Sequence, residues 1–235
     1  MTSLATDITF DLAGAPLREL NAALHKTAGE TNARRWQVLN PNGRHAVAVG
    51  INAPLEIDVA GHVGYYCAGM NQQARVTIHG NAGVGVAENM MSGFVHVKGD
   101  ASQAAGATAH GGMLLIDGNA SARCGISMKG IDIIVKGSIG HMSAFMGQAG
   151  NLIVFGDAGD ALGDSLYEAK LFVRGSVKSL GADCIEKELR DEHKALLAEK
   201  LAAAGLGGTV DVSEFKRYGS ARRLYHFHID NVDAY

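Results

Sequence analysis

Glycine recurs at an interval of 19 residues, seven times and without insertion or deletion, at Gly61, Gly80, Gly99, Gly118, Gly137, Gly156 and Gly175. The residues two and four positions before each of these glycines are all aliphatic, from Ile57 and Val59 in the first repeat to Leu171 and Val173 in the last. Such alternation is typical of a strand with one buried face, and a glycine at its end predicts a turn with a positive φ. Each repeat therefore contributes one strand.

The repeat length favours a β-solenoid. Nineteen residues are too few for a helix pair, the leucine-rich signature is absent, and 19 is not a multiple of the six residues typical of left-handed hexapeptide solenoids. Crossovers between parallel strands are nearly always right-handed. We therefore predict an all-β fold over residues 51–183, a right-handed single-stranded parallel β-helix of about seven 19-residue coils. A uniformly small column, seven residues after each glycine, predicts a narrow interior: Ala68, Ala87, Gly106, Gly125, Ala144, Gly163 and Ala182.

Both ends differ from the repeat. Residues 1–50 are expected to form an N-terminal cap, with a short helix over Pro16–Lys26 that carries leucines at positions i, i+3 and i+7. Residues 184–235 are expected to contain an amphipathic helix over Ile185–Ala204 and then a partner-binding tail. Caps of this kind protect the open strand edges of a solenoid.

One outward-facing column changes from polar to apolar along the repeats. It begins with Asp58, Thr77 and His96 and continues with Leu115, Ile134, Ile153 and Phe172. An exposed apolar ladder needs a cover, either the helix after Ile185 or a partner chain. The residues that we expect at such an interface are Leu115, Ile134, Ile153, Phe155, Phe172, Tyr218, Tyr225 and Phe227.

Composition argues against several classes of function. A net charge of -3 without a basic stripe argues against nucleic-acid binding. The absence of a long apolar run and of a basic, then apolar, leader predicts a cytoplasmic protein. The three cysteines do not have the spacing of a metal site, and neither a nucleophile elbow nor a paired-carboxylate motif is evident. We expect no catalytic, cofactor-binding or metal-binding residue on this chain.

Three strings carry a family resemblance: Gly80-Asn81-Ala82-Gly83-Val84-Gly85, the segment from Ser92 to Ala101, and Gly156-Asp157-Ala158-Gly159. They resemble the GXGXG domain of the glutamate synthase large subunit, over roughly residues 50 to 185. The tail from Phe215 to His228 is most similar to the free-standing GXGXG subunit of N-methylglutamate synthase, or methylamine-glutamate N-methyltransferase, in which this domain is a separate chain.

The resemblance implies a non-catalytic interface subunit of an enzyme complex that forms N-methylglutamate and ammonia from methylamine and glutamate. The implied partners are a glutamine-amidotransferase-like subunit and a glutamate-synthase-like subunit that carries FMN and an iron-sulfur cluster. Two alternatives remain open. One is the related solenoid subunit of a formylmethanofuran-dehydrogenase-like or formyltransferase/hydrolase complex. The other is a stand-alone carbohydrate-acting β-helix enzyme, for which Asp58 and Asp117 would be the outward-facing acids.

Overall fold

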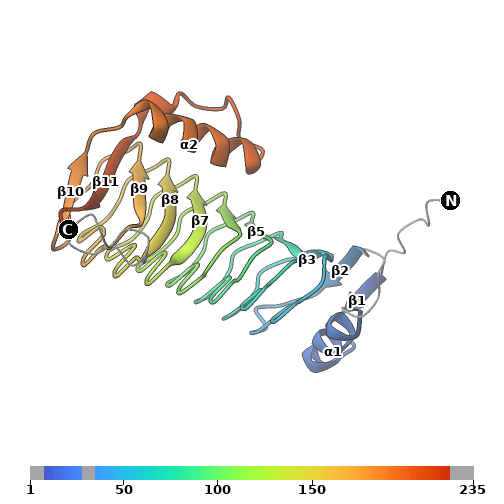
Figure 1. The fold of residues 1–235 in the computed structure, drawn as a ribbon. Coiled ribbons are helices and arrows are strands. Elements are labelled where there is room, and N and C mark those ends of the chain that lie inside the picture. The colour runs from blue at the N-terminus through green and yellow to red at the C-terminus, as the bar shows by residue number, and fades with distance from the viewer. Residues whose placement is uncertain (1–7, 28–34, 223–235) are drawn as a thin grey trace, which may run out of the picture.

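The computed structural model describes residues 8–27 and 35–222, which form a parallel β-solenoid of about seven turns with a helix near each end (Figure 1). The parallel strands are β1 (Ile8–Asp11), β2 (Arg35–Leu39), β3 (Glu56–Ala60), β4 (Arg75–Ile78), β5 (Phe94–Val97), β6 (Met113–Ile116), β7 (Lys129–Val135), β8 (Ala149–Val154) and β9 (Lys170–Val173). The other elements are α1 (Leu17–Thr27), β10 (Cys184–Lys187), α2 (Asp191–Ala203), the 3-10 helix η1 (Val212–Glu214) and β11 (Lys216–Ser220).

The strands stack in the register set by the repeat. Val59 pairs with Ile78, which pairs with Val97, and the same step of 19 residues continues to Val173. A second column of bridges runs parallel to it from Val63 to Val177. The predicted parallel β-helix is therefore confirmed. β2 and β1 extend the ladder by two more strands, because Trp36 pairs with Ile57 and Ile8 with Trp36.

The core is a single continuous cluster inside the coils. The two inward-facing residues of each repeat strand are buried, and the largest buried side chains include Ile57, Ile78, Leu114 and Ile116. Stacking apolar side chains in this way removes their surface from water, which stabilises the fold by roughly 25 cal/mol per Å². The interior is thus filled by side chains along its whole length.

Six of the seven repeat glycines are required for a different reason from the one predicted. Gly61 has a positive φ of 143°, but Gly80 and the later members of the column do not have a positive φ. A Cβ built on Gly80 would lie 2.7 Å from the backbone carbon of Gly61 in the preceding coil, and the same clash recurs at Gly156 against Gly137. Glycine is needed here because the backbones of successive coils stack directly on one another.

Positive φ occurs instead at three alternate positions later in each of the six coils that follow Gly61 to Gly156. In the coil that follows Gly61 these positions are Tyr66, Ala68 and Met70, with φ between 53° and 59°. The middle one of the three, Ala68 in this coil, belongs to the column of small residues predicted from the sequence. At Gly106 an added Cβ would lie 2.6 Å from Cδ1 of Ile133, so the column is small for reasons of both space and backbone conformation.

The predicted N-terminal helix is confirmed as α1, which lies against the N-terminal end of the solenoid (Figure 1). Leu20 and Leu24 are fully buried there. Asn21 donates from Nδ2 to the carbonyl of Ala46 at 2.9 Å and accepts from the amide of Ala48 at 3.1 Å. These bonds satisfy backbone groups of the first coil that have no preceding coil to pair with.

The predicted C-terminal helix begins later than expected. Cys184–Lys187 is strand β10, and α2 starts only at Asp191. β10 pairs antiparallel with β11, which is itself inserted antiparallel between β9 and β10, so Tyr218 lies beside both Leu171 and Glu186. Pairing with a later segment thus overrides the helical pattern at Ile185. Neither α1 nor α2 has the length and apolarity needed to cross a bilayer.

Candidate interface surfaces

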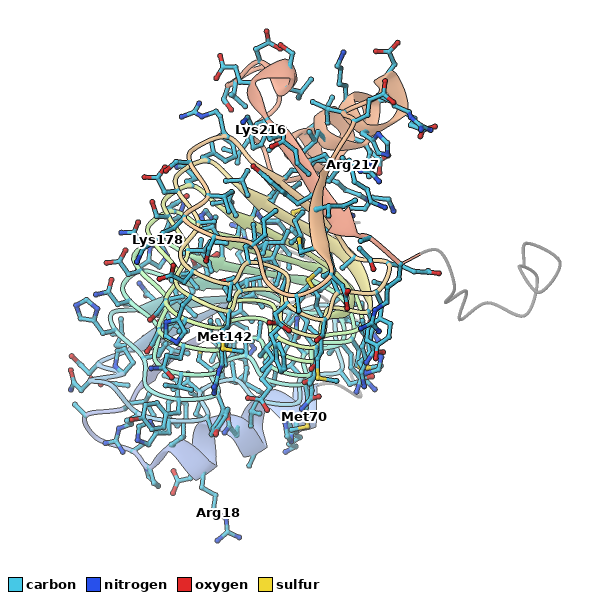
Figure 2. All side chains as sticks on the ribbon, turned by 90° about the vertical axis from the view of Figure 1, so that its left-hand side faces the viewer. Arg18, Met70, Met142, Lys178, Lys216 and Arg217 are labelled. Atoms are coloured by element: carbon cyan, nitrogen blue, oxygen red, sulfur yellow. The ribbon has the colours of Figure 1, made fainter. Side chains whose placement is uncertain are left out.

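The apolar outer ladder is covered by the chain's own C-terminal segment. Leu115, Ile134, Ile153 and Phe172 are at most 2% exposed. They pack with Leu197 and Leu201 of α2 and with Phe215. α2 runs along the outer face of the later strands in Figure 1, and Figure 2 shows Lys216 and Arg217 on the same side of the solenoid. Of the two covers left open by the sequence, the structure shows the intramolecular one.

The other predicted interface residues are separated by the fold. Phe155 is partly buried at the margin of this cluster, with its ring centroid 5.6 Å from that of Phe215. Tyr218 is 4% exposed and packs into the interior core rather than onto the outer face. Tyr225 and Phe227 lie outside the described residues. A role for these residues in contacts between chains remains a prediction. Because α2 covers the ladder, a partner at this position would contact α2 as well.

The outer face of β2–β5 is polar, in contrast to the ladder under α2. We call it the open face, and it carries Arg35, Gln37, Glu56, Asp58, Arg75, Thr77, Phe94 and His96. Two shallow hollows of about 490 and 410 Å³ lie on it, and both are lined by Arg35 and Asp58. His79 adds to the first hollow and Arg75 to the second. The open face is therefore a recessed polar surface on the first coils of the solenoid.

Charges on the open face are mostly paired across neighbouring strands. Nε of Arg35 lies 2.7 Å from Oε2 of Glu56, and Nε2 of His79 lies 2.9 Å from Oδ1 of Asp58. Such exposed pairs contribute little to stability, although they orient the side chains. They leave a patterned surface of alternating charge.

A more buried ionic cluster lies where the polar and apolar halves meet. Asp117 accepts from Nε2 of His96 at 3.0 Å and from Nζ of Lys136 at 3.1 Å, and Nζ of Lys98 lies 3.7 Å away. Burial lowers the pKa of His96 although Asp117 opposes the shift. Burial acts to raise the pKa of Asp117, but the hydrogen bond from Lys136 and the charge of His96 outweigh it, so this pKa lies below its usual range. Asp117 is thus held as a carboxylate, which is unsuited to the general acid of a glycosidase.

Sequence reasoning missed a polar ladder that links the coils. After each repeat glycine except Gly175, the side chain of the next residue accepts a hydrogen bond from the backbone amide of its equivalent in the next coil. Asn81 accepts from the amide of Asp100 at 2.9 Å, and Asp100 accepts from that of Asn119 at 2.7 Å. The full ladder is His62, Asn81, Asp100, Asn119, Ser138, Asp157 and Ser176, the last of which donates. The signal was present in the sequence, because six of the seven are Asn, Asp or Ser, which commonly accept from nearby backbone amides.

Four of the exposed large apolar side chains gather on two adjacent coils. Tyr65, Tyr66, Met70 and Met91 are each between 47% and 51% exposed. The ring of Tyr65 stacks on His45 at a centroid distance of 4.4 Å and meets Tyr66 edge-on at 6.3 Å. This second surface lies on the turns of the coils and is independent of the face that α2 covers.

The cysteines behave as core residues. Cys67, Cys124 and Cys184 are buried free thiols. Burial raises the pKa of Cys67 and Cys124 to about 12, so both remain protonated and poor nucleophiles. Within residues 8–27 and 35–222, no group of three or more His, Cys, Asp or Glu side chains is placed to hold a metal ion.

The fold and its surfaces define the class of protein: a parallel β-solenoid with a filled interior, whose outer face is partly covered by its own helix and partly open. Comparison with protein-family profiles finds no match. Protein GlxC of Rhizobium meliloti (strain 1021) is 68% identical over 225 residues, which cover 96% of this chain and 98% of that protein. The chain therefore belongs to the GlxC family.

Proposed function

We propose that this chain is a non-catalytic structural subunit of a glutamate-synthase-like enzyme complex, in which it holds the catalytic subunits in position. The observation that carries the proposal is the long, filled rod of stacked coils with an open polar face, on a chain whose repeats resemble the GXGXG domain. A rod of this kind presents a continuous binding surface, as solenoids commonly do.

The more specific proposal concerns the reaction of the complex. The tail from Phe215 onward resembles the free-standing GXGXG subunit of N-methylglutamate synthase, which supports a complex that forms N-methylglutamate and ammonia from methylamine and glutamate. Its partners would be an amidotransferase-like chain and a chain that carries FMN and an iron-sulfur cluster. All redox and transfer chemistry would then take place on those partners.

The test is a pull-down of the tagged chain from its native host, with flavin absorbance and mass spectrometry of the recovered proteins. Co-purification of an FMN-bearing, glutamate-synthase-like chain with an amidotransferase-like chain is the expected result. Recovery of the chain folded, alone and without flavin would overturn the scaffold proposal. A complex that assembles but makes no N-methylglutamate from methylamine and glutamate would overturn only the specific reaction.

A further inference from the structure

We infer that the open face binds a segment of a partner subunit through a carboxylate side chain that pairs with Arg75. This inference rests on the proposed function, because it assumes that a partner subunit exists.

Arg75 differs from the other charged residues of the open face. Glu56, Asp58 and Asp117 each have a basic side chain within 3.1 Å. Among the residues that the structure describes, Arg75 has no carboxylate within salt-bridge distance. Its guanidinium carbon lies 4.0 Å above the centroid of the Phe94 ring, and the residue is exposed. The face therefore carries one guanidinium that stacks on an aromatic ring instead of forming an ion pair, although Glu56 lies opposite it on β3.

The stacking on Phe94 prepares Arg75 to bind an anion. A guanidinium held against an aromatic ring has lost part of its rotational freedom but keeps its in-plane N–H donors free. Those donors match the two oxygens of a carboxylate in a bidentate pair. Arg75 also lines the hollow of about 410 Å³, together with Thr77 and Arg35, so a side chain that enters this hollow would meet Arg75.

The mixture of charges favours a protein segment over a polyanion. Glu56 and Asp58 line the same hollow and would repel a run of phosphates. A polypeptide with one carboxylate opposite Arg75, and neutral or basic residues elsewhere, complements this pattern. Arginine is also among the residues that most often dominate the energy of protein interfaces.

The open face is continuous with the apolar surface on which α2 packs. Phe94 packs against the apolar cluster under α2 and also carries the Arg75 guanidinium on its ring. Ala204 and Leu206, just after the end of α2, belong to the margin of the same cluster. A partner segment on the open face would therefore extend the cover that α2 begins, and would bury the exposed part of Phe94.

The experiment measures the affinity of the full chain for the purified partner subunits, with Arg75→Gln compared with the unaltered chain. Arg18→Gln is the matched control, because Arg18 lies on α1, outside the open face, and points away from the solenoid (Figure 2). We expect Arg75→Gln to weaken binding at least tenfold and to reduce its dependence on salt, and Arg18→Gln to change neither. Thr77→Glu is a second variant, which should weaken binding because the added carboxylate would repel the partner's carboxylate in the hollow.

A photo-reactive amino acid at position 77 then identifies the segment that lies on the open face. The expected cross-linked peptide contains an Asp or Glu, and replacing that residue by its amide should weaken binding by the same factor as Arg75→Gln, without a further loss in the double variant. Equal affinity of Arg75→Gln and the unaltered chain, or a cross-link to a segment without a carboxylate, would overturn this inference while leaving the scaffold function intact. A failure of the unaltered chain to bind any subunit would overturn both.

Discussion

The backbone amide of Ser138 donates a hydrogen bond of 2.9 Å to Oδ1 of Asn119, which lies 19 residues earlier in the preceding coil. The same bond recurs between successive coils along the polar ladder. Each one satisfies a backbone donor that the strand ladders do not reach.

Asn119→Ala should therefore lower the free energy of unfolding by about 1 kcal/mol, since the amide of Ser138 loses its acceptor and must find water. The longer bond of 3.3 Å from Nδ2 of Asn119 to Oδ1 of Asp100 is exposed and is lost as well. Asn119→Ser should restore part of this loss, because Ser138 itself accepts the equivalent bond from Asp157. Urea denaturation measures both. Gln103→Ala, on an exposed position of the preceding coil, is the control and should change little. An Asn119→Ala variant as stable as the unaltered chain would show that the ladder is incidental.

Gly118→Ala should destabilise the solenoid by about 2–3 kcal/mol, as expected for overpacking of a close backbone contact. The added Cβ would lie 2.8 Å from the carbonyl oxygen of Gly99. Gly14→Ala is the matched control, since nothing lies within 4 Å of a Cβ at that position. Thermal unfolding of the two variants compares them directly. Equal melting temperatures would contradict direct stacking of the coils.

Arg123→Gly should stabilise the protein by about 0.5–1 kcal/mol. Arg123 is exposed and has a φ of 59°, where a side chain other than glycine is strained. Glycine relieves that strain, although its greater freedom in the unfolded chain offsets part of the gain. Arg123→Ala keeps the Cβ and should give no gain. A chemical denaturation series that ranks alanine above glycine here would refute the assignment of strain.

Acidification should loosen the start of α2. His193 is 7% exposed, and its Nδ1 accepts a hydrogen bond of 3.1 Å from the amide of Arg190. Burial, reinforced by the charge of Arg217, lowers the pKa of His193 below its ordinary value of 6.5, although Glu192 opposes the shift. The folded state therefore favours the neutral ring. The stabilisation is present above the ordinary pKa of 6.5 and is lost as the pH falls through the folded-state pKa.

Hydrogen exchange of the α2 amides at about pH 7.5 and about pH 5.5, on either side of the ordinary histidine pKa and corrected for the intrinsic rates, measures this effect. We expect protection to fall at the lower pH. His193→Gln keeps an acceptor at the same position but does not titrate, so its protection should vary much less. A pH dependence that survives in His193→Gln would assign it to another group.

The part of the fold that follows from local pattern could be predicted from the sequence. The 19-residue interval determined the strand register, because apolar alternation and stacking are both properties of the repeat itself. The reason for the repeat glycines could not be predicted in the same way, since the close approach of Gly80 to Gly61 arises only when the coils are stacked. The residue types of the polar ladder are evident in the sequence, but the hydrogen bonds between them form only when the coils are stacked.

The C-terminal segment shows where local pattern fails. Ile185 and Leu189 lie on one face of a helical pattern, yet Ile185 is in β10 because it pairs with Gly219, far along the chain. A pairing across that separation leaves no local signal. The role of Arg75 on the open face could not be predicted from the sequence either. Each charged residue there is ordinary by itself, and Arg75 differs from the others only in the ion pairs and ring contact that form between strands.

The insertion of β11 between β9 and β10 separates the order of synthesis from the order of assembly. The coils up to β9 can stack one after another as the chain emerges, because each needs only the coil before it. β10 has no such neighbour until β11 arrives, and Leu115 to Phe172 stay uncovered until α2 has been made. A chain truncated before Lys216 would therefore have complete first coils but an unpaired strand edge at β9. Pairing by the short segment Lys216–Ser220 thus determines whether this edge is capped or remains exposed and prone to aggregation.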